Sequence, residues 1–191
     1  MIISLGVAAD DCIRYTGGTG WPGTFANFAT YTTLRRDHIL TIYTVDVIFL
    51  RFNTSVIPPG ATITSAKLYL YIDYIAEPSH APAGSIYGEY YLPANWPPVQ
   101  GDGSVEADPT AFTVAPPFAE GTWLSPDLSN LGSISRDGYT GFRLVLGTGE
   151  PPQEFFDSTI RLSSYEMADG NAAYLDVEYT GGASQLAMFV R

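Results

Sequence analysis

Two strand-like segments joined by a Pro-Pro-Gly turn occupy the middle of this 191-residue chain. The first, Asp46–Phe52, is a dense apolar run, which is typical of a strand covered on both faces. The second, Lys67–Asp73, alternates apolar and polar residues with the period of two that a half-buried strand requires. The alternation predicts one set of side chains in the core, namely Leu68, Leu70 and Ile72, and another set outside it, namely Lys67, Tyr69 and Tyr71.

The rest of the chain also consists of strand-forming residues separated by turn-forming residues, including 19 Gly and 14 Pro. Further strands are predicted at Ile2–Val7, Asp11–Tyr15, Thr30–Leu34, Ile39–Tyr43, Ser85–Leu92, Thr122–Leu128, Gly141–Leu146, Ser158–Ser163 and Ala173–Tyr179. We expect loops at Thr16–Gly23 and Pro93–Pro117 and a turn at Arg35–His38. About nine or ten regularly spaced strands predict an all-β fold, a two-sheet antiparallel β-sandwich.

The length suits one domain, for which we expect residues 1–180. Gly181 and Gly182 then mark a hinge before a short C-terminal tail, residues 181–191. The large apolar residues of this tail are Leu186, Met188, Phe189 and Val190. Two interpretations are open: the tail is one more strand of the same sandwich, or an arm that packs on a neighbouring subunit.

The formal net charge of −11 excludes several partners. Phosphate binding needs clustered Lys and Arg, so nucleic acid is not an expected partner, and anionic membrane surfaces should repel the chain. No segment approaches the ~20 apolar residues that cross a bilayer, so we expect no membrane insertion. Met1–Ala9 is apolar but short and has no basic region, so we do not interpret it as a signal peptide.

Cys12 is the only cysteine, which excludes an internal disulfide and favours a buried apolar role for it.

Four blocks of the chain carry a resemblance to a known family. They are Asp10–Arg14 followed by Asn27–Leu34; Phe49–Ile72, the most specific of the four; Gly141–Leu144; and Ser163–Glu166 followed by Ala173–Thr180. In these blocks the chain resembles the DNRLRE-type domain, a disaggregatase-related, carbohydrate-binding-module-like jelly roll found mainly in large exported proteins. The resemblance spans most of residues 10–180 and implies a sandwich of jelly-roll type. Pro93–Pro117 has no clear counterpart in the family pattern.

No catalytic arrangement is visible in the sequence, so we expect a protein that is not an enzyme. The two histidines, His38 and His80, lie in no nucleophile-elbow context, and pairs of carboxylates are expected by chance among 20 acidic residues. Calcium is the metal to which the chain is best suited. The candidate ligands are Asp102, Glu106 and Asp108, which offer hard oxygen atoms on a Gly-containing loop. Apart from this structural calcium ion, we expect no cofactor.

Flat exposed aromatic rings can stack on sugar rings, which makes the tryptophans candidate ligand contacts. Trp21 lies in the predicted Gly-rich loop and Trp96 in the predicted Pro-rich loop, and these two are the candidates for glycan stacking. The alternative is that each covers an end of the core or fills a subunit contact. For Trp123 we favour that alternative.

Two functions are expected from these features. The first is a non-enzymatic structural protein of a phage or virus-like particle, as a surface decoration, fibre or tail subunit. Such a chain would be assembled in the host cytoplasm, located in the virion, and partnered by copies of itself and other virion proteins. A jelly roll that starts with Met and shows no export signal motivates this expectation. The alternative is a carbohydrate-binding module of a secreted or cell-surface protein, acting on surface glycans outside the cell.

Overall fold

The computed structural model describes residues 1–7, 12–18, 21–27, 31–39, 42–76, 84–99, 102, 110–147, 156–163 and 170–182. Within these ranges the backbone forms twelve strands, one short 3-10 turn at Leu131–Ser133 and no α-helix. The strands are β1 (Ile2–Gly6), β2 (Cys12–Gly18), β3 (Trp21–Asn27), β4 (Tyr31–Ile39), β5 (Ile42–Asn53), β6 (Ala61–Ala76), β7 (Ile86–Tyr90), β8 (Thr110–Val114), β9 (Thr122–Leu124), β10 (Tyr139–Leu146), β11 (Phe156–Ser163) and β12 (Tyr174–Gly181). The predicted all-β class is confirmed.

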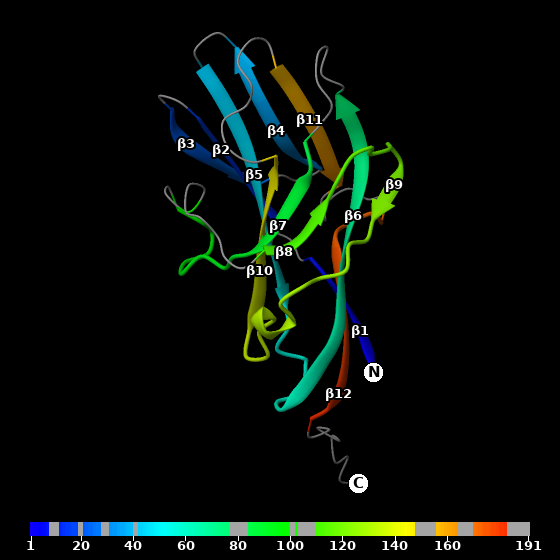
Figure 1. Ribbon diagram of the computed structural model, residues 1–191. Coiled ribbons are helices and arrows are strands. Elements are labelled where there is room, and N and C mark those ends of the chain that lie inside the picture. The colour runs from blue at the N-terminus through cyan, green and yellow to red at the C-terminus, as the bar shows by residue number, and fades with distance from the viewer. Residues whose placement is uncertain are drawn as a thin grey trace.

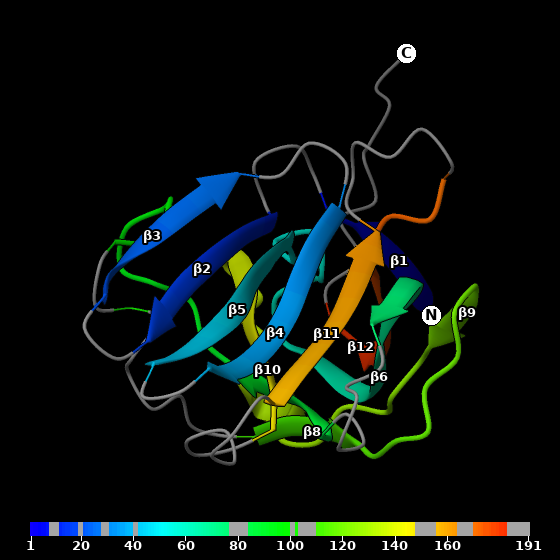
Figure 2. The same ribbon diagram turned by 90° about the horizontal axis from the view of Figure 1, so that it is seen from above.

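Antiparallel pairing joins the described strands into one curled sheet. Its order is β1-β12-β6-β11-β4-β5-β10-β7-β8, with β2 and β3 extending it from β5 and β9 extending it from β6. The sheet folds over on itself, so that β3, β2, β5, β4 and β11 lie side by side in one layer, with β10 and β12 behind them (Figures 1 and 2). The result is the predicted two-sheet antiparallel sandwich of jelly-roll type.

The fold-over occurs at β5, because this strand changes partners along its length. Residues 42–46 pair with β4 in one layer, and residues 48–53 pair with β10 in the other. The two faces of the strand pack into different clusters, with Ile48 and Leu50 in the main core and Val47 and Phe49 in a second one, and none of the four is more than 3 % exposed. The dense apolar run that the sequence shows here is the consequence of that double coverage.

The 16-residue strand β6 is shared in the same way. Residues 61–69 pair with β12, and residues 72–76 pair with β11. The predicted alternation is confirmed, because the inward set is buried: Leu68, Leu70 and Ile72. The outward set is only half-buried: Lys67, Tyr69 and Tyr71. One face of β6 thus belongs to the core and the other remains available to solvent.

The main core lies between the two layers and receives alternate side chains from each. Phe52 of β5 and Phe142 of β10 meet edge to face, with ring centroids 5.9 Å apart. A second, smaller cluster lies on the other face of β5 and consists of Ile13, Val47 and Phe49. The segment that follows β7 covers this cluster with Tyr91 and Trp96.

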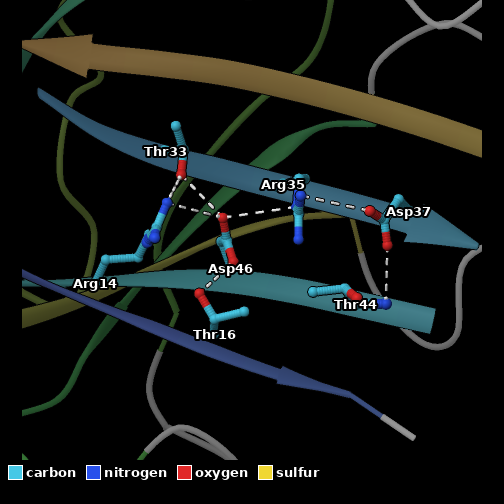
Figure 3. A network of polar contacts seen from close by, with 7 residues as sticks. All are labelled: Arg14, Thr16, Thr33, Arg35, Asp37, Thr44 and Asp46. Atoms are coloured by element: carbon cyan, nitrogen blue, oxygen red, sulfur yellow. Dashed lines mark hydrogen bonds and ion pairs between the residues drawn. The ribbon is translucent and has the colours of Figure 1, made fainter. Parts of the chain in front are cut away.

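A network of polar contacts joins β2, β4 and β5 outside the core (Figure 3). Asp46 of β5 is 1 % exposed and lies at its centre. Its carboxylate accepts hydrogen bonds from Thr16 Oγ1 at 2.7 Å and Thr33 Oγ1 at 2.9 Å. Arg14 Nη1 at 3.5 Å and Arg35 Nε at 3.8 Å supply the opposite charge. A carboxylate this deeply buried requires such partners, so the network holds the three strands in register.

The structure corrects three expectations of irregular backbone. Residues 35–38 are not a turn: they lie within β4, where Arg35 and Asp37 belong to the polar network and Arg36 is buried. Thr16–Gly23 is not a loop throughout, because β2 continues to Gly18 and pairs with β3 from Trp21. Pro93–Pro117 contains strand β8, which pairs with β7. In the first two cases polar residues or glycines lie on paired strands, whereas β8 is a short strand-forming segment, Thr110–Val114, within a Pro-rich stretch.

Close packing of β7 against β8 generates a testable prediction. A Cβ atom added at Gly88 would lie 2.0 Å from Cε1 of Phe112, whose ring is itself only 5 % exposed. Gly88→Ala is therefore expected to lower the free energy of unfolding by about 1–3 kcal/mol, because the buried ring has little room to move. Urea denaturation monitored by tryptophan fluorescence measures this change.

Gly138→Ala is the matched control, because no atom lies within 4 Å of a Cβ added there. This variant should stay within about 0.5 kcal/mol of the parent protein. Equal stabilities for the two variants would contradict the packing that the structure shows at Gly88.

Candidate binding face

Four aromatic side chains gather on the outward side of β6, β9 and β12. The strand register places Tyr69 opposite Tyr174 and Tyr71 opposite Trp123. Because directly paired residues point to the same face of a sheet, all four rings lie on one side. We refer to Tyr69, Tyr71, Trp123 and Tyr174 as the aromatic face.

The rings of the aromatic face contact one another in a continuous row. Tyr69 and Tyr174 stack with centroids 4.2 Å apart and planes inclined by 7°. Trp123 meets Tyr174 edge to face at 5.4 Å and Tyr71 in the same manner at 5.2 Å. The indole of Trp123 is 39 % exposed, although tryptophan is highly buried on average. The contacts hold the rings in fixed positions while leaving apolar surface open to a ligand.

Charged and hydroxyl groups surround the aromatic face. Lys67 of β6 forms an ion pair with the exposed Asp127 at 3.3 Å. Asp176, two residues after Tyr174 on β12, accepts a hydrogen bond from Ser4 Oγ of β1. Next along β12, Glu178 accepts a hydrogen bond from Ser65 Oγ at 3.0 Å. These groups can exchange hydrogen bonds with a ligand that lies across the rings.

At the other end of β6, Arg161 of β11 pairs with Asp73 and its guanidinium carbon lies 5.1 Å from the ring centroid of Tyr74. Tyr74 is 44 % exposed and extends the aromatic surface in that direction. Among the described residues, the charged side chains around this surface include two cations, Lys67 and Arg161, and four carboxylates, Asp73, Asp127, Asp176 and Glu178. Their balance is negative, in line with the charge of the whole chain.

The phenol of Tyr174 stays protonated at neutral pH. Partial burial, the neighbouring Tyr69 and the charge of Asp176 all raise the pKa of the Tyr174 hydroxyl. The Tyr69–Tyr174 stack therefore presents a neutral hydroxyl donor at Tyr174 over the physiological range.

The structure places Trp96 on a different part of the molecule. Its ring packs against the Phe49 cluster, and the guanidinium carbon of Arg51 lies 4.4 Å from its centroid. Arg51 is also 4.5 Å from the ring centroid of Tyr139, so it is held between two aromatic rings. Trp96 is half-buried, and its role in glycan stacking stays a prediction. Trp21 begins strand β3 rather than lying in a loop, and its side chain is outside the described residues.

Of the predicted calcium ligands, only Asp102 falls within the described residues. Its carboxylate accepts hydrogen bonds from the Tyr91 hydroxyl at 2.6 Å and from the Val99 amide at 2.7 Å. Both carboxylate oxygens therefore already have a protein donor. Glu106 and Asp108 lie outside the described residues, so the calcium site stays a prediction. In the described part of the chain, no group of three or more His, Cys, Asp or Glu side chains is arranged to hold a metal ion.

The interior carboxylates that the structure shows are paired with arginine. Asp46 lies between Arg14 and Arg35, and Glu89 contacts Arg143 Nη2 at 2.7 Å. Each of these carboxylates therefore has a charged partner within the protein. The predicted tail residues Leu186, Met188, Phe189 and Val190 lie outside the described residues. Among those that are described, no helix is long and apolar enough to span a bilayer.

Sequence reasoning did not identify the aromatic face as a site. It predicted that Tyr69 and Tyr71 point outward, yet it assigned Trp123 to a core or subunit contact and gave Tyr174 no role. The usable signal was the recurrence of aromatic residues at outward positions of two strands, Lys67–Asp73 and Ala173–Tyr179. What was missing was the knowledge that these strands are neighbours, with β9 on the other edge of β6.

Comparison with known proteins returned no match, either among protein-family models or among curated proteins.

The contact between Tyr91 and Asp102 predicts an alkaline dependence of stability. Burial, followed by the hydrogen bond and charge of Asp102, raises the pKa of Tyr91 to about 12, above its ordinary value of 10.0. Because the folded state holds this proton more tightly, the contribution to stability is complete below pH 10 and is lost as the pH rises through 12. Tyr91→Phe should therefore cost about 1 kcal/mol at pH 7 and make the decrease above pH 10 shallower.

Urea denaturation at pH 7, 10 and 11.5 measures both effects. Tyr139→Phe, which alters a 37 % exposed tyrosine, is the control and should reproduce the parent profile. A Tyr91→Phe profile parallel to that of the parent above pH 10 would contradict the proposed contribution.

Proposed function

We propose that this chain is a non-enzymatic binding protein whose aromatic face contacts saccharides. The observation that carries the proposal is the row of four mutually contacting rings on the outward side of β6, β9 and β12, with Trp123 39 % exposed. Saccharides present apolar ring faces and polar edges. A rigid aromatic surface bordered by carboxylates, hydroxyls and an ammonium group suits both features.

The charge around the aromatic face favours neutral saccharides. Four carboxylates outnumber two cations there, and the chain as a whole carries a net charge of −11. Uronic acid polymers and sulfated glycans would meet repulsion during approach. Neutral hexose, pentose or N-acetylhexosamine units would not.

Replacing the rings separates this proposal from binding elsewhere. Trp123→Ala and Tyr174→Ala should each weaken the affinity for a neutral oligosaccharide about tenfold or more, as loss of a central aromatic contact does in other interfaces. A glycan array identifies the ligand, with cellohexaose, xylohexaose and chitohexaose as neutral probes and polygalacturonate as the anionic one. Titration calorimetry then gives the affinities.

Tyr139→Ala removes an exposed ring from another part of the surface and should leave the affinity unchanged. Loss of binding in Trp21→Ala or Trp96→Ala, with Trp123→Ala unaffected, would move the saccharide site to the tryptophans predicted from the sequence. An array with no bound saccharide would overturn the proposal.

A second candidate function, a structural protein of a phage or virus-like particle, is favoured by apolar exposure at one end of the sandwich. Met1 is 76 % exposed, Ile2 66 % and Val56 57 %. Strand register places all three at the end where β12 finishes, since Ile2 pairs with Glu178 and the turn containing Val56 leads into Ala61, which pairs with Gly181. Exposed apolar residues gathered in one region favour contact with another protein. The apolar sequence of residues 183–191 continues from the same end.

Deleting residues 183–191 tests this second function. We expect the truncated chain to fold and to bind saccharide as before, but to be excluded from particles of the phage that encodes it, because a tail arm would supply its contact with other virion proteins. Mass spectrometry of purified particles measures incorporation. Particles that contain the truncated chain at the normal level would contradict the role of the tail as an arm.

A further inference from the structure

The hydrogen bonds of β1 show which of its backbone groups face outward. Met1 and Tyr179 exchange two bonds, with the Met1 ammonium donating to Tyr179 O at 2.9 Å and the Tyr179 amide donating to Met1 O at 3.0 Å. At the other end of the strand the Val7 amide donates to Ala173 O at 3.1 Å. In an antiparallel pair, hydrogen-bonded and non-hydrogen-bonded residues alternate. The odd-numbered residues of β1 therefore bond to β12.

The even-numbered residues Ile2, Ser4 and Gly6 consequently direct their amide and carbonyl groups away from β12. All three are exposed. β1 is the last strand of the sheet order, and no described residue pairs with its outer edge. Three donors and three acceptors are therefore aligned along an edge that no described strand occupies, which is the arrangement that templates the addition of another strand.

The sequence of residues 1–7 lacks the side chains that commonly block strand addition. Natural edge strands are commonly blocked by charged side chains, proline or bulges. Residues 1–7 read Met-Ile-Ile-Ser-Leu-Gly-Val and contain neither a charged side chain nor a proline, and the pairing with β12 has no bulge.

We propose that two copies of this chain associate through antiparallel pairing of their β1 strands, centred on Ser4. Ile2 then pairs with Gly6 of the second copy, Ser4 pairs with Ser4, and Gly6 pairs with Ile2. Two bonds at each of these three pairs give about six backbone hydrogen bonds. The half-buried Ile3 and Leu5, which pack against the edge of the core, gain cover from the same residues of the second copy.

A second copy is the occupant because the edge is complementary to itself. The pairing is two-fold symmetric, uses the open edge of both copies and leaves no further β1 edge exposed, so the assembly closes as a dimer. The two-fold axis is perpendicular to the joined sheet, because Ser4 faces Ser4 on one side of it. Gly6 lies opposite Tyr174, so the even-numbered residues of β1 point to the same side of the sheet as the aromatic face. A two-fold axis perpendicular to the sheet keeps this side common to both copies, and the two aromatic faces therefore lie on the same side. If the aromatic face binds saccharide as proposed, the dimer would engage a polymeric ligand at two points.

Ser4→Pro tests the dimer. Proline removes the outward amide of Ser4 and is tolerated in an edge strand where the amide faces solvent, so the pairing of β1 with β12 should survive. Ser4→Ala is the matched control, because it also removes the side-chain bond to Asp176 but keeps the amide. Size-exclusion chromatography with light scattering, from about 1 to 200 µM, should show a concentration-dependent dimer for the parent and for Ser4→Ala. Ser4→Pro should be monomeric.

Deletion of residues 183–191 should leave the dimer intact; a monomeric product would show that the tail, not β1, makes the contact and would overturn the proposal. A parent that is monomeric throughout, or a Ser4→Pro variant that still dimerises, would do the same.

Hydrogen exchange on the parent provides a readout that does not depend on folding of the proline variant. The amides of Ile2, Ser4 and Gly6 should become protected as concentration rises, whereas Ile3 and Leu5 are protected throughout. Uniform protection of all five amides at every concentration would contradict the dimer. Because saccharide binding is not measured here, failure of the dimer and failure of the proposed function remain distinguishable.

Discussion

The architecture depends on two long strands, β5 and β6, that each pair with partners in more than one part of the sheet. A strand inside a sheet must satisfy its backbone groups along both edges, and a buried strand must cover both faces. β5 meets the first requirement by pairing with β4 and then β10 along one edge and with β2 along the other. Its interior residues are accordingly apolar on both faces, and the exception, Asp46, is enclosed by hydroxyls and two arginines. Without that change of partner the sheet would not fold over into a sandwich.

The same arrangement positions the candidate binding face. β6 contributes one face to the core, so its other face must either be polar or serve a function. Between Lys67 and Asp73 it carries two tyrosines, and β9 and β12 add Trp123 and Tyr174 beside them. The rings stabilise one another through stacked and edge-to-face contacts. A rigid aromatic surface built on paired strands keeps its shape in the absence of a ligand, which lowers the entropic cost of binding.

Much of the fold could be predicted because the period of two is a local property. Leu175, Val177 and Tyr179 share a face in the sequence pattern and are buried in the structure, as are Leu68, Leu70 and Ile72. The failures occurred where a strand does not follow the pattern of one apolar and one polar face. Residues 35–38 were expected to form a turn because three of them are charged and one is His, yet Arg35 and Asp37 reach the network around Asp46 and Arg36 is buried. Glycines at the end of β2 were likewise expected in a loop, although Gly17 and Gly18 pair with Val45 and Thr44 of β5. In both cases partners distant in the sequence decided the outcome.

The sequence by itself therefore determined the fold class, the inward and outward sets of most strands, and the acidic net charge. These follow from side-chain chemistry and from the alternation of a single strand, and neither depends on knowing the neighbours. Only the tertiary structure decided that Tyr69 stacks on Tyr174, that Trp123 stands between Tyr71 and Tyr174, and that β1 comes last in the order of the described strands. Each of these features either joins segments at least fifty residues apart in the chain or depends on the order of the strands in the sheet. That order is set by hydrogen bonding and burial over the whole domain.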